Sequence, residues 1–279
     1  MRSKWRDFGI SILYFLNAVG GQVLVGAIIG IVGGIIIAVK HAINNPTEEV
    51  PMDLILEFVT KATTWMIIIS AGFSLLIYLL VFKIAKKSFI AGTGLVKGKG
   101  LYLIFSIILG ITLNFIISGI INITDIQRFF PEHQKISELL VGETSLIVTF
   151  LAVVITAPFF EEIVFRGLIL GQMKKSFPII VAVIIQSLLF GLYHFNVLQG
   201  MYAFILGIAA GVVCLWGDSL WNAILLHLSF NGTSLIIGQL FKDKDMTTIY
   251  YLITISLSLC AAIFVFILFY QRKEQRACS

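Results

Sequence analysis

Long apolar segments alternate with short polar segments along the chain, and this pattern predicts a bundle of membrane-spanning helices. A helix needs ~20 apolar residues to cross ~30 Å of hydrocarbon. Eight segments approach or exceed this length, at residues 8–39, 62–82, 101–123, 145–172, 179–195, 200–216, 219–240 and 248–270. The expected fold class is therefore all-α, a polytopic membrane protein of about eight transmembrane helices.

The composition agrees with a membrane protein. Hydrophobic residues make up 58% of the chain and charged residues 13%, whereas soluble domains average about 25% charged residues. The mean hydropathy of +0.99 leaves too little polar surface to cover a soluble fold. These values exclude a soluble enzyme, a disordered chain and a disulfide-stabilised domain, and we expect the lipid bilayer as a partner.

The basic residues predict the orientation of the chain. With the N-terminus in the cytoplasm, 14 of the 20 Lys and Arg residues fall on the cytoplasmic side, or 13 without Arg166, which lies within a segment. Because cytoplasmic loops are enriched in Lys and Arg, we expect both termini in the cytoplasm and the protein in a plasma membrane, most simply a bacterial one. The formal net charge of +5 then reflects orientation, and no nucleic-acid partner is expected.

No internal repeat or linker interrupts the chain, so we expect one integral membrane domain. Its first part, residues 1–140, carries N-terminal helices and no diagnostic motif. Residues 145–240 carry the polar residues described below, and residues 241–279 form the last helix and a cytoplasmic tail.

Small residues at helical spacing predict close contacts between helices. Gly26, Gly30 and Gly34 recur every four residues in the first segment, and Gly207 and Gly211 do so in the sixth. Glycines at this spacing let helix backbones approach each other in lipid.

Two adjacent carboxylates lie inside the fourth apolar segment. Glu161 and Glu162 are surrounded by Phe, Ile and Val, and a charge at this depth marks a functional site by default. Arg166 follows Glu162 by one helical turn, so the two side chains can pair on one face. The side chain of Glu161 points about 100° away from that of Glu162 around the helix axis, so it does not share the pair with Arg166 and is available for another role.

Two histidines and an asparagine occupy neighbouring segments. His194 lies in the fifth segment, and His227 lies one turn before Asn231 in the seventh. Glu161 is 16 residues before Phe177 and His194 is 17 residues after it, so an antiparallel hairpin brings both to the same depth, about 25 Å from the turn. We therefore expect one buried layer that contains all of these side chains.

This set of residues suits the hydrolysis of a peptide bond. A carboxylate and an imidazole that share a water molecule can deprotonate it for attack on a carbonyl, and Glu161 with His194 fits that role. The tetrahedral oxyanion then needs hydrogen-bond donors, which His227 and Asn231 can supply. Pro158, one turn before the carboxylates, is expected to kink the helix and free a backbone carbonyl.

Three short motifs stand in order in neighbouring segments: EEIVFRG, FGLYH and HLSFN. They match the patterns EExxxR, FxxxH and HxxxN, and together they resemble the CPBP family of intramembrane proteases, which includes Rce1-type CAAX prenyl endopeptidases and abortive-infection or bacteriocin-immunity relatives. The residues at the motif positions are Glu161, Glu162, Arg166, Phe190, His194, His227 and Asn231.

The resemblance implies an eight-helix protease in which Glu161 and His194 activate water and His227 and Asn231 stabilise the oxyanion. Glu162, Arg166 and Phe190 are then supporting residues. The implied substrate is a peptide or membrane protein, and neither its identity nor recognition of a prenyl group follows from the sequence. No cofactor is expected.

Three other functions remain open. One Glu and two His residues also suffice for a catalytic zinc site, although no local spacing supports one. A non-catalytic membrane scaffold or bacteriocin-immunity protein is a second alternative, because one fold can host unrelated functions. A transporter with a proton relay is a third, and the absence of repeats argues against it. The oligomeric state is not predicted.

Overall fold

The computed structural model describes residues 3–46, 49–132, 145–241 and 246–277, and every regular element in these ranges is a helix. Elements η2 and η3 have π-helical hydrogen bonding and η1 is a 3₁₀ helix. The elements are α1 (Lys4–Asn44), α2 (Met52–Ile84), α3 (Phe89–Thr93), α4 (Gly100–Thr124), η1 (Ile126–Phe129), α6 (Leu146–Thr149), η2 (Phe150–Thr156), α7 (Ala157–Glu162), η3 (Ile163–Leu170), α8 (Gly171–Met173), α9 (Ile179–Tyr193), α10 (Val197–Gly217), α11 (Leu220–Leu240) and α12 (Thr248–Ala277).

Elements α6 to α8 follow one another without a break and form a single helix, Leu146–Met173, which we call the motif helix because it carries EEIVFRG. Within the described residues, seven helices are long and apolar enough to cross a membrane. The all-α, polytopic membrane architecture expected from the sequence is confirmed. The eighth predicted segment, 179–195, forms α9, which has only 15 residues.

Helix α9 is shorter than the other helices that the apolar segments predict. At 1.5 Å per residue, α9 is about 22 Å long, against ~30 Å of hydrocarbon. The helix ends at Tyr193, and a turn of three residues that begins with His194 leads directly into α10. His194 therefore lies in the turn of a helical hairpin, one residue after the end of α9.

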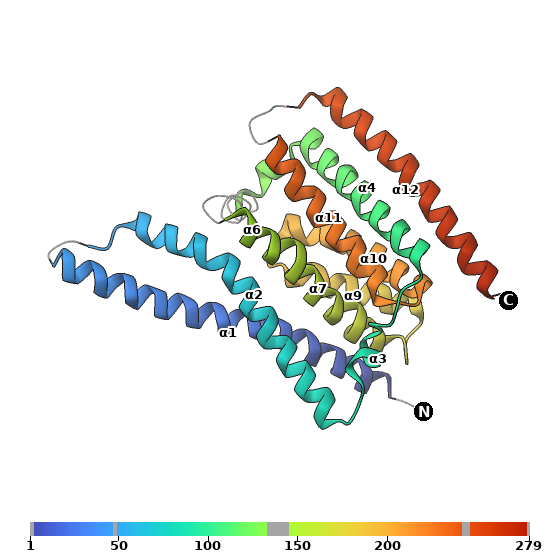
Figure 1. The fold of residues 1–279 in the computed structure, drawn as a ribbon, viewed down its shortest axis with the longest axis horizontal. Helices are drawn as coiled ribbons and strands as arrows, with labels where there is room; N and C mark the ends of the chain where they lie inside the picture. The colour runs from blue at the N-terminus through green and yellow to red at the C-terminus, as the bar shows by residue number, and fades with distance from the viewer. Residues whose placement is uncertain (1–2, 47–48, 133–144, 242–245, 278–279) are drawn as a thin grey trace.

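The helices form three groups in space (Figure 1). The hairpin of α1 and α2 lies along one edge, and α12 lies along the opposite edge beside α4. The motif helix, α9, α10 and α11 lie between these edges. The start of α1 and the end of α12 lie at the same end of the bundle, as an even number of passages along it requires.

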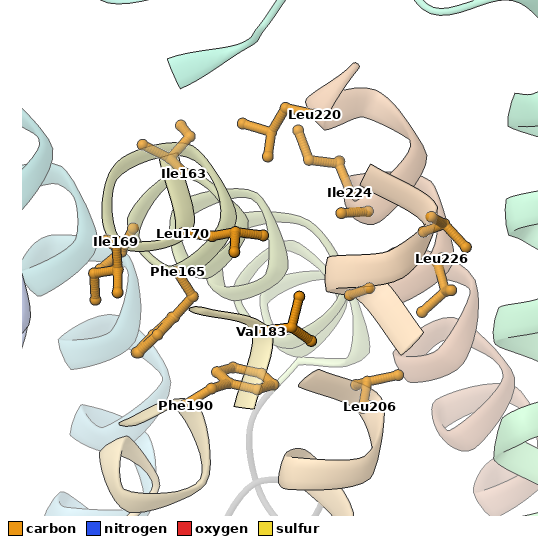
Figure 2. Packing of buried hydrophobic residues seen from close by; sticks show 14 of the residues in the cluster. Ile163, Phe165, Ile169, Leu170, Val183, Phe190, Leu206, Leu220, Ile224 and Leu226 are labelled. Atoms are coloured by element: carbon orange, nitrogen blue, oxygen red, sulfur yellow. The ribbon is translucent and has the colours of Figure 1, made fainter. Parts of the chain in front are cut away.

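The motif helix is the best-buried helix of the bundle. Half of its most apolar 18-residue window is buried, whereas only 11% of the corresponding window of α1 is buried. Every residue of η3 is buried, and Figure 2 shows Ile163, Phe165 and Leu170 packed toward side chains of α9, α10 and α11. A helix that is apolar on all sides is stable in this position because neighbouring helices cover it all round.

The glycine contacts agree with the sequence in one hairpin and not in the other. A Cβ at Gly207 would lie 2.9 Å from Ser187, and one at Gly211 would lie 3.1 Å from Gln186, so close packing of α10 on α9 is confirmed. In α1, a Cβ at Gly26 would meet Met66, but Gly30 and Gly34 face open space. Of these three glycines, only Gly26 makes the predicted close contact with another helix among the described residues.

Candidate active site

One carboxylate oxygen of Glu162 joins two helices. Arg166 donates to Oε1 of Glu162 over 2.9 Å, and Nδ1 of His227 lies 2.8 Å from the same oxygen. The Glu162 and Arg166 side chains are completely buried. The pairing expected from their spacing is present, and through it the motif helix is tied to α11.

The contact with Glu162 determines which nitrogen of His227 carries a hydrogen. An ionised carboxylate only accepts hydrogen bonds, so Nδ1 of His227 is the donor and Nε2 faces away from Glu162. Nε2 lies 3.8 Å from Oε2 of Glu161. This separation is too long for a direct hydrogen bond and suits a bridge through one small molecule such as water.

Phe190 is the centre around which the charged and aromatic side chains of the site gather. The guanidinium carbon of Arg166 lies 4.4 Å from the centroid of the Phe190 ring, a cation–π geometry. The rings of His194 and His227 pack edge-on against the same ring, with centroids 4.9 and 5.6 Å away. Phe190 is fully buried, so it fixes the positions of three motif side chains from two other helices and its own.

His194 is oriented by its own helix. Its Nδ1 lies 2.9 Å from the carbonyl oxygen of Phe190. Because a carbonyl only accepts hydrogen bonds, Nδ1 carries the hydrogen, and neutral His194 therefore presents a lone pair on Nε2. Among the described residues, no hydrogen bond or ion pair joins His194 to Glu161, and their expected cooperation stays a prediction.

Asn231 is held by the irregular part of the motif helix. Its Nδ2 donates to the carbonyl oxygen of Val153 over 2.9 Å. Val153 lies in the π-helical stretch η2, where a carbonyl bonds to the N–H five residues later. That position is Pro158, which has no N–H. One hydrogen of the Asn231 amide therefore binds the carbonyl oxygen of Val153, which has no N–H donor at Pro158. For the second hydrogen of this amide, no hydrogen bond to a described residue is recorded.

The buried polar atoms of the site are not all satisfied by the described residues. Oε2 of Glu162 and both Nε and Nη2 of Arg166 have no hydrogen-bond partner there. Buried polar atoms of this kind are usually bound to ordered water. The layer around Glu162 is thus polar enough to hold water inside an otherwise apolar bundle.

The structure also contains features that the sequence did not indicate. Asp7, in the first turn of α1, is completely buried. It accepts a hydrogen bond of 2.7 Å from Gln172 at the end of the motif helix, and it also contacts Ser176. The partners lie more than 160 residues apart in the chain, so no local pattern could have revealed this contact. It fixes α1 to the end of the motif helix.

Phe195 is a second unexpected feature. It follows His194 in the turn after α9 and has a φ of 51°, in the left-handed region that residues with a bulky side chain rarely adopt. Strained residues of this type often border functional sites. Here the strained turn lets the chain reverse immediately after His194.

The described residues contain no group of three or more His, Cys, Asp or Glu side chains arranged to hold a metal ion. Glu161, Glu162 and His227 come together as an ion-pair and hydrogen-bond network.

Comparison with known families adds an independent observation. Residues 143–233 match the family model described as Type II CAAX prenyl endopeptidase Rce1-like. Over these residues the chain is similar to the Rce1-like endopeptidases. The resemblance suggested by the three motifs is confirmed, and this Rce1-like segment, about a third of the chain, contains all seven motif positions. No curated protein and no solved structure matches the chain.

The Rce1-like segment supports an intramembrane endopeptidase of the CAAX type in general, and hence a hydrolase that acts on a peptide substrate in the bilayer. The segment coincides with the most buried helices of the bundle. The α1–α2 hairpin and α12 lie outside it.

Proposed function

We propose that this chain is a glutamate-dependent intramembrane endopeptidase that hydrolyses a peptide bond without a metal ion. The observation that carries the proposal is the buried contact of His227 with both carboxylates, 2.8 Å from Glu162 and 3.8 Å from Glu161. A peptide or a membrane protein is the proposed substrate.

The proposed chemistry requires a particular placement of protons in this layer. Glu161, Glu162 and Arg166 together carry one net negative charge when all are ionised, and one added proton makes the cluster neutral, the least unfavourable form to bury. In the proposed scheme this proton is on His227, so that Glu161 is a carboxylate base and Nε2 of His227 is a donor.

The first proposed step is the attack of water. Glu161 removes a proton from a water molecule that Nε2 of His194 also orients, and the water oxygen forms a bond to the carbonyl carbon. The carbonyl π electrons move to its oxygen. Nε2 of His227 and the second amide hydrogen of Asn231 then donate to this oxyanion, the type of stabilisation that contributes most in a buried site.

The second proposed step is the collapse of the tetrahedral intermediate. The carbon–nitrogen bond breaks, and the leaving nitrogen receives the proton that Glu161 took from water. Glu161 returns to its carboxylate form, and the products are a new carboxyl end and a new amine end. Glu162 and Arg166 do not exchange protons with the substrate in this scheme, because their role is to hold the His227 ring in one orientation, with Nδ1 bound to Glu162.

We further propose that both termini face the cytoplasm of a bacterial cell. The turn between the motif helix and α9 contains Lys174 and Lys175, which the distribution of basic residues assigns to the cytoplasmic side. Labelling of single cysteines introduced at Lys175 and at Arg128 with a membrane-impermeant reagent tests this orientation. Labelling of intact cells at Lys175 but not at Arg128 would reverse it.

The proposal is tested by comparing new protein N-termini in membranes that contain wild-type protein, Glu161→Gln or Glu57→Gln at equal levels. Glu57 is the matched control, since it is an exposed glutamate on α2 that pairs with Lys61. We expect fragments that are present with wild type and Glu57→Gln and absent with Glu161→Gln. If all three membranes give the same N-termini and the Glu161→Gln protein keeps the full biological effect, the non-catalytic scaffold replaces the protease.

A further inference from the structure

A cavity of about 400 Å³ lies between α4, α11 and α12, away from the motif helix. It is situated where α4 and α11 end and α12 begins, at the end of the bundle opposite to the start of α1 (Figure 1). Its volume falls within the range of small-molecule binding sites, about 300–1,000 Å³. The cavity is partly open at its mouth.

The wall from α4 is polar in a regular way. Asn114, Ser118 and Asn122 follow one another at intervals of four residues, so they share one face of the helix. Tyr250 and Thr254 do the same on α12. Polar residues in a membrane helix face protein partners or a polar cavity rather than lipid. Three polar residues on one face of α4 therefore indicate that this face lines a polar cavity.

The two asparagines retain unused hydrogen-bonding groups. Asn114 donates to the carbonyl oxygen of Phe230, and Asn122 donates to that of Ser118. Each amide has a second N–H and a carbonyl oxygen, for which no hydrogen bond to a described residue is recorded. These groups match the hydroxyl groups of a glycerol or a sugar, which donate and accept hydrogen bonds equally well.

The other part of the lining is apolar. Phe115, Ile237 and Phe241 belong to the wall, and Tyr250 and Tyr251 line it from the first turn of α12. Tyrosines concentrate at the level of the lipid headgroups, where one end of the ring is apolar and the other is wet. A ligand at this depth is thus an amphiphile with its headgroup among the asparagines and its chain along the bundle.

Among the described residues, those that line the cavity include no Asp, Glu, Lys or Arg. The connection between α11 and α12, residues 242–245, lies outside the described part of the chain. A phosphate headgroup needs cationic donors, and the described lining supplies amide and hydroxyl groups instead. We propose that this cavity binds the uncharged, hydroxyl-bearing headgroup of a glycerolipid or glycolipid.

The proposal stands independently of protease activity, although the site adjoins α11. The carbonyl of Phe230 that Asn114 binds lies between His227 and Asn231 in the chain. Gly238, which lines the cavity, follows Asn231 by seven residues, or about two helical turns, so the cavity is displaced along α11 from the candidate active site.

A photoreactive monoacylglycerol with a diazirine in its acyl chain tests the site on the full-length protein in nanodiscs. We expect cross-links to concentrate on the ends of α4, α11 and the start of α12. Excess 1-oleoylglycerol should reduce them about tenfold, while the anionic oleoyl-lysophosphatidylglycerol and free glycerol should not. Equal labelling of α1 and α2, or equal competition by the anionic lipid or by glycerol, would overturn the proposal.

A pair of glycine variants controls for effects on folding. Gly238 lines the cavity and Gly34 lies on the exposed surface of α1, and a Cβ at either position meets nothing within 4 Å. Gly238→Leu fills the cavity and should lower the labelling about tenfold, whereas Gly34→Leu should leave it unchanged. Asn122→Leu should lower labelling as well, since it removes one polar group. Unchanged labelling in Gly238→Leu would contradict the proposal.

Discussion

Two glutamates in this protein pair with a basic residue one helical turn later, and their surroundings differ completely. Glu57 pairs with Lys61 on α2 over 2.5 Å, and about half of each side chain is exposed. Glu162 pairs with Arg166 in the motif helix over 2.9 Å, and both side chains are fully buried. The same sequence spacing thus produces a solvated surface pair in one helix and a buried network in another.

The difference lies in what surrounds each pair. The Glu57–Lys61 pair lies on the α1–α2 hairpin, most of which faces lipid or solvent, whereas His227 and Phe190 both contact the Glu162–Arg166 pair. A buried pair is held by its neighbours because a lone buried charge is very unfavourable. A pair of charged residues at this spacing therefore becomes part of a buried network only where other helices pack around it.

The largest expected effect comes from removing one partner of each pair. Arg166→Met leaves Glu162 buried without its cation and should destabilise the protein by about 3–5 kcal/mol. Lys61→Met, the matched change in the exposed pair, should cost at most ~1 kcal/mol. Reversible unfolding in mixed micelles measures both. Equal losses of stability would show that the two pairs do not differ in the way described.

A second prediction compares two asparagines that bind backbone carbonyls of another helix. Asn231→Ala removes an oxyanion donor and the bond to Val153, and should lower kcat by about 10²–10³-fold. Asn17 donates to the carbonyl of Ser74 within the α1–α2 hairpin, and Asn17→Ala should leave kcat within about twofold. Cleavage rates of the two variants against wild type decide the point. A similar loss in both would remove Asn231 from the site.

A third prediction concerns the aromatic centre. Phe190→Leu keeps an apolar side chain but removes the ring that contacts Arg166 and both histidines, and should destabilise the protein by about 1–3 kcal/mol. Phe264→Leu is the control, because Phe264 is exposed on α12 and should change stability by less than ~0.5 kcal/mol. Thermal unfolding of the two variants provides the measurement, and an unaffected Phe190→Leu protein would contradict the role of Phe190.

The smallest expected effect concerns metal. The proposed chemistry uses no metal ion, so prolonged dialysis against a chelator should leave the cleavage rate unchanged. Elemental analysis of the purified protein, performed before and after dialysis, gives the second readout. Stoichiometric zinc whose removal stops cleavage, and whose return restores it, would favour the metalloprotease alternative.

The sequence predicted the helices well because apolar length alone distinguishes a membrane span. It also brought out the motif residues, since carboxylates and histidines are rare in apolar segments. The predicted segment 179–195 runs two residues beyond α9, which ends at Tyr193, because the chain turns at His194 and Phe195. Apolar composition does not report where a chain reverses.

The contacts of the site could not be predicted from spacing. Glu161 and His194 were matched by depth, yet the imidazole recorded beside Glu161 is that of His227. The depth of a residue along its helix does not determine the direction in which its side chain points. The bond between Asn231 and Val153 likewise depends on the π-helical register before Pro158, which a propensity for helix does not reveal.

In the proposed mechanism, Glu161 activates a water molecule for direct attack on the peptide bond. The most direct measurement is a single turnover by purified protein in nanodiscs, carried out in ¹⁸O-labelled water with a substrate found from the N-terminal comparison. We predict one ¹⁸O atom in the new carboxyl group with wild-type protein, and no product with Glu161→Gln. Product that carries only ¹⁶O, or cleavage by Glu161→Gln at the wild-type rate, would contradict the account.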